Sequence, residues 1–319
     1  MQTVNVDVDW MDPEYIKGMP IVPHDQTSNQ LWVDIQLGDD SNRDLLLETA
    51  KELKNEGWLA IYTRMAVLMC KKNINSIRGR VLLQTLPSNA FRFQETLHHA
   101  RLYDKEFARA GIGRDRYCIK IPSTGPALNA AKVLSSEGIP TLGTALFSLP
   151  QAIACSQAGM LYISPYYNGK FKDLGHQDNC LVIRLMIFIT VQEAMAAGEM
   201  GCHSATISHT VLNELAKLPY VASEQPGPDI PKPAHVYKDA APVSDRLRKL
   251  LSVDPLAGPD WDGKLASTDV NYLADGGAPL QNAIEADAVT NKRLADAMAL
   301  FTGGQERSRA KIEEVLPLV

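Results

Sequence analysis

One lysine of this sequence stands inside an apolar run. Lys120 lies between Ile119 and Ile121 in residues 117–122, YCIKIP. Side chains alternate along a strand, so its amine is expected to point opposite these neighbours, toward the interior of a barrel. Burial favours the neutral amine, which can attack carbonyl carbon and form a Schiff base. That iminium draws electrons from the adjacent carbon, so a carbon–carbon bond there can form or break without a cofactor. Taken alone, a strand lysine is more often an ion-paired or snorkelling residue.

The elements that would position Lys120 alternate along the chain between residues 31 and 218. Strands are predicted at 31–36, 58–63, 79–85, 117–122, 140–147, 159–166, 180–189 and 202–208. Helical patterns are predicted at 43–56, 89–110, 125–136, 149–158, 190–200 and 209–218. Eight strands that alternate with helices predict an α/β fold, a (β/α)8 TIM barrel. A doubly wound open sheet is disfavoured because no G-x-G-x-x-G follows the first strand.

The chain is expected to form a single domain over residues 1–319. Its barrel is predicted at about 28–220, an extended segment with a short helix near 243–251 at 221–284, and a C-terminal helical extension at 285–319. One barrel unit is weak, because 13 residues separate Tyr166 from Cys180 and leave little room for a crossover helix. Alternatively, residues 181–197 form one continuous helix and the seventh strand is missing.

Composition excludes several classes of protein. The 319 residues are 45% apolar and carry a formal charge of −5, which is typical of a globular chain without general attraction to nucleic acid or anionic membranes. The first 20 residues have no secretory pattern, and the longest apolar run, 181–191, is too short for a bilayer and contains Arg184. Five dispersed cysteines without a C-x-x-C pair indicate reduced thiols, so we expect a cytoplasmic protein.

Polar residues within or at the ends of the predicted strands are the candidates for chemistry. In a parallel barrel, such residues gather around one pocket at the carboxyl ends of the strands. Besides Lys120, the candidates are Asp34, Thr63, Arg64, Gln84, Thr144, Ser164 and Tyr166.

The sequence around Lys120 indicates which chemistry this lysine could perform. Residues 119–165 read IKIPSTGPALNAAKVLSSEGIPTLGTALFSLPQAIACSQAGMLYISP. This stretch resembles the transaldolase family of Schiff-base barrel enzymes, with four strand ends in the same order and at matching intervals. The resemblance extends, less firmly, over roughly the whole chain.

The resemblance implies roles for individual residues. Lys120 is similar to the Schiff-base lysine, and Asp34 in WVDIQ resembles the general acid/base carboxylate that takes and returns a proton of the substrate hydroxyl. Thr144 resembles the threonine that helps to hold the catalytic water. Gln84 stands where transaldolases proper carry glutamate and the smaller fructose-6-phosphate aldolases carry glutamine, and an amide can orient water but not activate it. Tyr166 matches the tyrosine of the aldolase branch.

The sequence also departs from the family pattern where substrate is bound. The second-strand motif Thr-Thr-Asn-Pro-Ser is aligned here with residues 62–66, YTRMA, so Thr63 and Arg64 become substrate-binding candidates together with Ser164 and Tyr166. Gly169 stands where the family has an arginine for the sugar phosphate, and residues 186–189, MIFI, replace another phosphate contact. Phosphate needs charge-assisted donors, so a weakened sugar-phosphate site is expected unless the short sixth unit is misaligned.

The resemblance therefore implies a transaldolase-like Schiff-base enzyme that transfers or cleaves a dihydroxyacetone-type unit between ketose and aldose substrates. It implies no cofactor and no metal. The expected partner is a small-molecule sugar or ketone, and neither nucleic acid nor a membrane. A homodimer is one option for the oligomeric state, which the sequence leaves open. The alternative function is a non-catalytic barrel that acts as a binding or regulatory protein.

Overall fold

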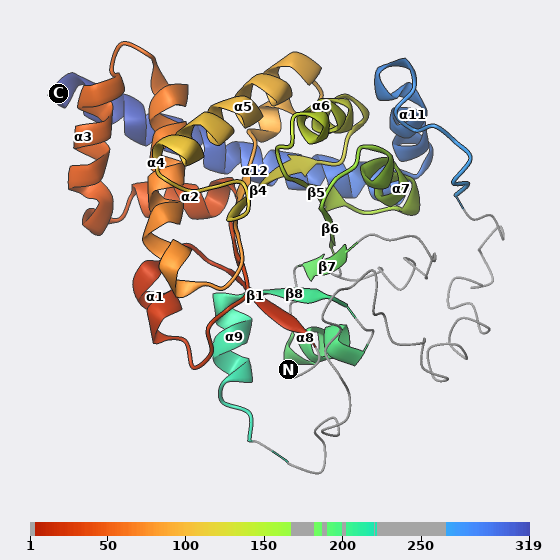
Figure 1. Ribbon diagram of the computed structural model, residues 1–319, viewed down its shortest axis with the longest axis horizontal. Coiled ribbons are helices and arrows are strands. Elements are labelled where there is room, and N and C mark those ends of the chain that lie inside the picture. Colours follow the sequence, from red (N-terminus) through yellow and green to blue (C-terminus); the bar gives the residue numbers. More distant parts are fainter. Residues whose placement is uncertain (1–3, 167–181, 187–189, 200–201, 220, 222–265) are drawn as a thin grey trace.

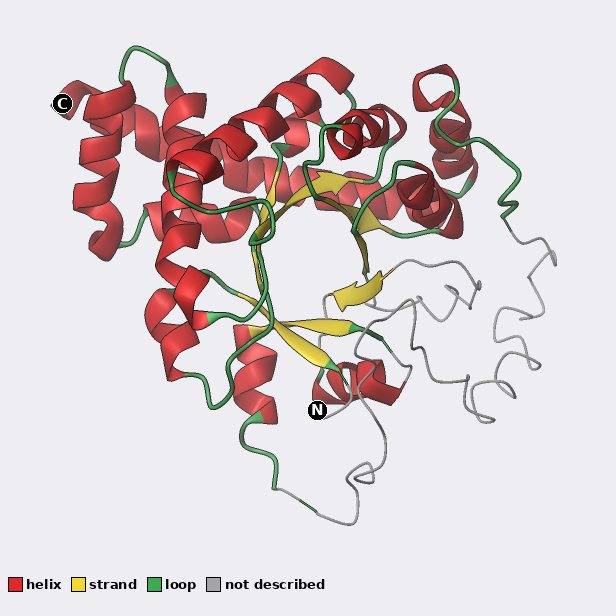
Figure 2. Cartoon of the chain, viewed as in Figure 1, coloured by secondary structure: helices red, strands yellow, loops and turns green. Residues whose placement is uncertain are grey.

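Eight parallel strands form a closed barrel in the computed structural model, which describes residues 4–166, 182–186, 190–199, 202–219, 221 and 266–319. Neighbouring strands follow chain order, and the first strand pairs with the eighth. Figure 2 shows the strands as a ring with helices on its outside. The strands are β1 (Asn5–Asp9), β2 (Gln26–Thr27), β3 (Val81–Gln84), β4 (Tyr117–Pro122), β5 (Thr141–Leu146), β6 (Tyr162–Pro165), β7 (Val182–Met186) and β8 (Ser204–Ser208).

The described helices surround this ring, and the last of them crosses behind several others (Figure 1). They are α1 (Pro13–Gly18), α2 (Gln30–Leu37), α3 (Arg43–Leu53), α4 (Trp58–Asn73), α5 (Phe93–Arg109), α6 (Gly125–Ser136), α7 (Leu149–Gln157), α8 (Val191–Glu199), α9 (His209–Leu215), α11 (Ala278–Ala286) and α12 (Ala288–Val315). Among the residues described, no helix is long and apolar enough to cross a bilayer.

The TIM barrel is confirmed, but its first two strands were predicted in the wrong place. Residues 31–36 lie in α2 and residues 58–63 lie in α4. Buried side chains of α4 recur at helical spacing, as Ile61, Met65 and Met69 show. The barrel instead begins at Asn5, well before residue 28, and its second strand spans only Gln26–Thr27.

The remaining elements agree with the prediction to within a few residues. Strands β3 to β8 occupy the six other predicted ranges, and α3 and α5 to α9 occupy the predicted helical ranges. One continuous helix over 181–197 is wrong, because β7 precedes the separate helix α8. The C-terminal extension is present as α11 and α12, although α11 begins before residue 285. The weak unit at 167–180 and the predicted helix at 243–251 lie outside the described residues.

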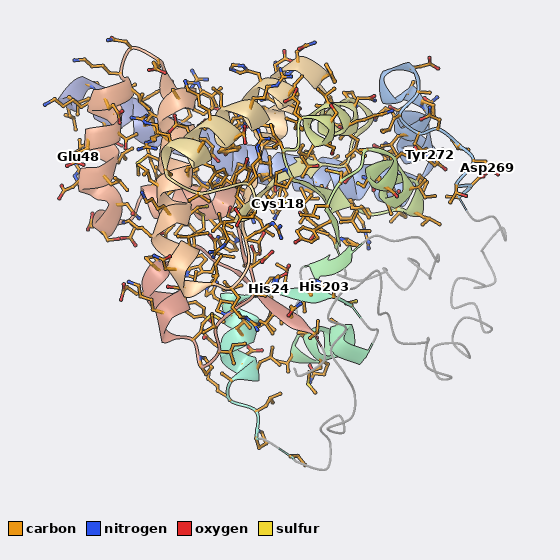
Figure 3. All side chains as sticks on the ribbon, viewed as in Figure 1. His24, Glu48, Cys118, His203, Asp269 and Tyr272 are labelled. Atoms are coloured by element: carbon orange, nitrogen blue, oxygen red, sulfur yellow. The ribbon has the colours of Figure 1, made fainter. Side chains whose placement is uncertain are left out.

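The barrel interior and its outer face are packed separately. Leu82, Cys118, Leu142 and Tyr162 form a small cluster of their own inside the ring, near the centre of Figure 3, where Cys118 is labelled. The residues between them, such as Ile119 and Ile121, belong to the larger core between strands and helices. This alternation fixes which side chains of each strand face inward.

Helix α12 packs closely against α2. At Gly304 a side chain would meet the backbone of Gln30 at 2.9 Å, so only glycine allows the two helices to approach this far. Arg307 Nε then donates to Asp34 Oδ2 at 2.6 Å, and Lys311 Nζ donates to the Asp34 carbonyl at 2.7 Å and also pairs with its carboxylate. The C-terminal helix thereby fixes the helix that directly follows β2.

An ionic group lies at the start of β2. His24 Nδ1 is 2.9 Å from Asp25 Oδ1 and 3.6 Å from Asp7 Oδ1, and both carboxylates are fully buried. His203 lies beside His24, with ring centroids 5.9 Å apart (Figure 3). The hydrogen bonds to the two carboxylates raise the pKa of His24 to about 9. The imidazole is therefore a cation at neutral pH.

This group predicts a loss of stability at alkaline pH. The pKa of His24 is raised from its ordinary 6.5 to about 9 on folding, so its contribution is complete below pH 6.5 and disappears as the pH rises through 9. We expect a contribution on the order of 2 kcal/mol to the free energy of unfolding. Denaturant unfolding at about pH 6 and about pH 9.5 should show this loss in the wild type and a smaller one in His24→Gln. The exposed His98→Gln variant is the control, and equal losses in wild type and His24→Gln would contradict the prediction.

Candidate active site

Lys120 lies inside the barrel, as the alternation of β4 predicts. Its side chain is 1% exposed, and Nζ donates to Thr27 Oγ1 at 3.0 Å. Burial lowers the pKa of Lys120 from 10.5 to about 8, although the charges of Asp9 and Cys118 oppose this shift. Roughly one fifth of such amines are neutral at pH 7.4, compared with about 0.1% for an ordinary lysine. Lys120 is therefore a usable nucleophile near neutral pH.

Asp9 supplies the carboxylate of the site. It is the last residue of β1 and is 8% exposed. Burial raises its pKa, while the charge of Lys120, a hydrogen bond from Trp32 and the charge of His209 lower it. Asp9 and Lys120 thus lie close enough for each charge to change the ionisation of the other. A carboxylate whose pKa is raised while it remains near a cation is suited to accept and return a proton.

Gln84 lies directly beside Lys120. The two residues are partners in the register of β3 and β4. Neither polar atom of the Gln84 side chain has a hydrogen-bond partner among the described residues, although both are buried. Its main chain is held from behind, because its carbonyl accepts from Gln30 Nε2 at 2.9 Å and from the Tyr103 hydroxyl at 3.2 Å. An orphaned amide next to the amine is free to hydrogen-bond water or substrate.

Thr144 and Tyr166 meet near the ends of β5 and β6, and β5 is the strand next to the Lys120 strand β4. Their hydroxyl oxygens are 3.3 Å apart, and burial raises the pKa of Tyr166. The backbone between them is irregular, since the register of β5 and β6 shifts and Ala145 has a φ of 50°. Gln151 Nε2 holds this turn by donating to the Ala145 carbonyl at 3.1 Å. Such strain, confined to one residue after Thr144, is typical of a functional site.

Ser164 is a further predicted site residue that lies on an inward strand face. It lies on β6 and is fully buried. It shares its face of the strand with Tyr162, which belongs to the cluster inside the barrel. The structure therefore brings five predicted site residues to the inward faces of neighbouring strands or to their carboxyl ends: Gln84, Lys120, Thr144, Ser164 and Tyr166.

Three predicted site residues lie elsewhere. Asp34 lies in α2, where Arg307 and Lys311 of α12 hold its carboxylate outside the barrel, so its assignment as the general acid/base is wrong. Thr63 lies in α4 and donates its hydroxyl to the Leu59 carbonyl at 2.7 Å. Arg64 pairs with Glu106 of α5 at 3.1 Å. All three assignments followed from strands predicted at 31–36 and 58–63, and both ranges are helical in the structure.

The sequence interpretation missed Asp9 and the segment after β2. Thr27, Ser28 and Asn29 stand where the second-strand motif Thr-Thr-Asn belongs, so the asparagine is not replaced by Arg64. Asn29 also begins α2, because its Oδ1 accepts from the backbone N–H of Leu31 at 2.9 Å. A signal for β1 was available, since valines alternate with polar residues in residues 4–9, VNVDVD. A two-residue strand such as β2 gives no comparable signal.

Other predicted differences from the family fall outside the described residues. This holds for Gly169 and for residues 187–189, and nothing is described of the Met186 side chain. The expected weakening of the sugar-phosphate site rests on these positions and stays a prediction.

Carboxylate and imidazole groups gather at one further place in the described part of the chain. Ligand-type atoms of Asp7, His24 and Asp25 lie within 4.8 Å of one another. Contacts with Asp25 and Asp7 raise the pKa of His24, so its protonated imidazole is matched by the two carboxylates. We therefore treat this group as an ionic contact of the fold.

Comparison with known proteins gives a family for this chain. The family described as Transaldolase/Fructose-6-phosphate aldolase matches residues 7–185, which is more than half of the chain. That range includes Asp9, Thr27, Gln84, Lys120 and Thr144. A solved structure from Silicibacter pomeroyi with the name "Putative glycerophosphoryl diester phosphodiesterase" aligns with 47% of this chain at 13% identity and a TM-score of 0.34. The aligned part is 55% of that chain, about half its length.

The two aspartates should respond differently to removal of their charge. Asp9→Asn removes the anion that raises the pKa of Lys120, so that pKa should fall below about 8. Asp34→Asn should leave the pKa of Lys120 unchanged but lower the free energy of unfolding by about 1–3 kcal/mol, because two cations lose their partner. The pH dependence of Lys120 labelling by reductive methylation, read by peptide mass, measures the first effect. If the pKa of Lys120 shifted in Asp34→Asn and not in Asp9→Asn, Asp34 rather than Asp9 would be the carboxylate of the site.

Proposed function

Because the chain belongs to the transaldolase/fructose-6-phosphate aldolase family, we propose that it is a Schiff-base enzyme that transfers or cleaves a dihydroxyacetone-type, three-carbon hydroxyketone unit between ketose and aldose substrates. The observation that carries this proposal is the buried Lys120 amine, whose pKa is lowered to about 8 beside the Asp9 carboxylate. This pair has the two functions that cofactor-free aldol chemistry needs, a nucleophilic amine and a proton acceptor.

The first step is addition of the neutral Lys120 amine to the ketone carbonyl of the donor. The carbinolamine loses water, and a protonated imine, the Schiff base, links Nζ to the substrate carbon. The hydroxyl of Thr27, at 3.0 Å from Nζ, fixes the direction of the amine before attack. Gln84, with both side-chain polar atoms buried and unpartnered in the described residues, can orient the water that is lost and later returns.

The second step breaks the carbon–carbon bond. Asp9 accepts the proton of the hydroxyl on the carbon beyond that bond, the O–H electrons form the aldehyde C=O, and the bonding pair moves into the iminium to give an enamine. The aldehyde then leaves. In transfer, the enamine carbon attacks an acceptor aldehyde and Asp9 returns the proton to the new hydroxyl; in cleavage, the enamine takes a proton on carbon. Water finally releases the ketone from Lys120.

Thr144 and Tyr166 are suited to assist the proton movements from β5 and the end of β6, since β5 neighbours the Lys120 strand. Their hydroxyls are 3.3 Å apart and both residues are buried. Burial and the nearby Asp9 charge raise the pKa of Tyr166, so it remains a neutral donor. A hydroxyl pair of this kind can hold one water against the Schiff base, which is the role that the family resemblance implies for Thr144.

Trapping at Lys120 tests the proposed function. With dihydroxyacetone and borohydride, the wild type should gain the mass of one reduced donor on Lys120, and the yield should rise with pH about a midpoint near 8. Lys120→Met should give no adduct at the site and lose at least about 1,000-fold in donor turnover, because no other group forms the iminium. Lys132→Met, which removes an exposed lysine of α6, is the matched control.

A folded wild type that gives no adduct with any ketone donor would contradict the proposal. In that case the non-catalytic barrel becomes the better interpretation, and sugars should stabilise the wild type and Lys120→Met equally against heat.

We further propose that the substrate site is poorly matched to sugar phosphates. The support is Gly169, at the position where the family resemblance expects a phosphate-binding arginine. We expect kcat/KM for fructose 6-phosphate with erythrose 4-phosphate to be no more than about tenfold above that for the unphosphorylated sugars, since each lost charge-assisted contact removes about 1.5–3 kcal/mol. A preference of several hundredfold for the phosphorylated pair would contradict this.

A further inference from the structure

Trp32 holds the carboxylate that the proposed reaction uses. Its indole Nε1 donates to Asp9 Oδ1 at 2.9 Å, from the first turn of α2. Among the described residues, this is the hydrogen bond that the Asp9 side chain accepts. A buried carboxylate needs such a donor, and one that contacts a single oxygen leaves Oδ2 free for substrate. The indole has no titratable proton near neutral pH, so it orients Asp9 without exchanging a proton with it.

Three elements that end at the barrel mouth hold Trp32 in place. Trp10, the residue after Asp9, packs edge-on against Trp32 with ring centroids 4.9 Å apart and planes at 79°. His209, the first residue of α9, stacks on Trp10 at 4.1 Å. Tyr15 of α1 packs against His209 and donates its hydroxyl to the His209 carbonyl at 3.0 Å. The rings therefore form a continuous aromatic cluster of Trp10, Tyr15, Trp32 and His209 along one side of the mouth.

The start of α2 sets the position of the indole. Asn29 Oδ1 accepts from the backbone N–H groups of Leu31 and Trp32, at 2.9 and 3.4 Å. Thr27, two residues before Asn29, accepts the hydrogen bond from Lys120 Nζ. One short segment therefore contacts both reacting groups: it meets the amine through Thr27 and the carboxylate through Trp32.

We propose that Trp32 is a positioning residue for the aldol step, which fixes Asp9 so that its second oxygen faces the substrate hydroxyl. This role rests on the proposed function of Lys120 and Asp9. Schiff-base formation needs the Lys120 amine, whereas carbon–carbon cleavage also needs an oriented Asp9. Loss of the Trp32 hydrogen bond should therefore slow cleavage and change Schiff-base formation little.

The test compares these two parts in Trp32→Phe, with fructose as the cleaved substrate and dihydroxyacetone as the trapped donor. Borohydride trapping on Lys120 should remain within about threefold of wild type, while release of glyceraldehyde in a single turnover should slow about tenfold to hundredfold, as expected for loss of a hydrogen bond to a charged group. Site-specific replacement of Trp32 by 3-benzothienylalanine, which keeps the ring shape and lacks the N–H, should slow cleavage to the same extent. Trp58→Phe, on the outer helix α4, removes an indole whose ring contacts are Tyr62 and Arg309, and it should behave as wild type.

The pH profile supplies a readout that a packing role would not change. The charges of Lys120 and His209 act on Asp9 and lower its pKa, and Tyr166, whose own pKa the Asp9 charge raises, stays neutral nearby. Without the indole N–H, the pKa of Asp9 should rise, so the acid limb of the cleavage rate should move to higher pH in Trp32→Phe and not in Trp58→Phe.

Each possible result decides the matter. If the wild type forms the adduct and both Trp32 variants cleave as fast as wild type with an unshifted acid limb, the positioning role is wrong and the proposed function stands. If trapping and cleavage fall together, Trp32 acts through the fold and the positioning role is again wrong. A wild type without any adduct overturns the proposed function and this role with it.

Discussion

The burial of one ammonium group inside a parallel barrel is the constraint around which the mouth of this protein is organised. Water would stabilise the charge of Lys120 far better than the barrel does, so the pKa falls to about 8 and the neutral amine becomes accessible. The same burial raises the pKa of Asp9, and each group partly reverses the shift of the other. A fully apolar surrounding would leave Lys120 neutral but also keep Asp9 protonated, so Asp9 could not accept a proton. A tight ion pair would keep Lys120 protonated and leave no nucleophile. Chemistry needs the state between these two, in which a neutral Lys120 and an ionised Asp9 are both accessible.

Contacts at several levels of the structure hold Lys120 and Asp9 near each other without pairing them as ions. Thr27 gives the amine a neutral hydrogen-bond partner in place of a carboxylate, and Trp32 gives Asp9 a neutral donor in place of a cation. Both residues belong to the segment that leaves β2 and enters α2. Helix α12 in turn fixes α2 at Gly304 and through the cations around Asp34. Residues of α12 therefore support the segment that contacts Lys120 and Asp9 in the barrel.

The sequence predicted the parts of this arrangement that carry a strong local pattern. The apolar run around Lys120 defined β4, and the helices after β4 and β5 were located to within about one residue. The errors have a shared cause: α2 and the first part of α4 are apolar enough over six residues to resemble buried strands, since short apolar runs fit either structure. A first strand at 31–36 implies Asp34 as the catalytic carboxylate, so the error in the strand extends to the site. Of the true strands, β1 carries a usable alternation of valines with polar residues, whereas β2 is hard to recognise because it has two residues, held by its neighbours rather than by its own propensity.

The contact between α2 and α12 has a consequence for how the protein is made. The Asp34 carboxylate is matched by Arg307 and Lys311, which are separated from it by 273 and 277 positions. During synthesis, the ribosome delivers these cations only 273 and 277 residues after Asp34. The nascent α2 must therefore remain without this partner while those residues are translated, and it acquires its mature arrangement when α12 docks against it.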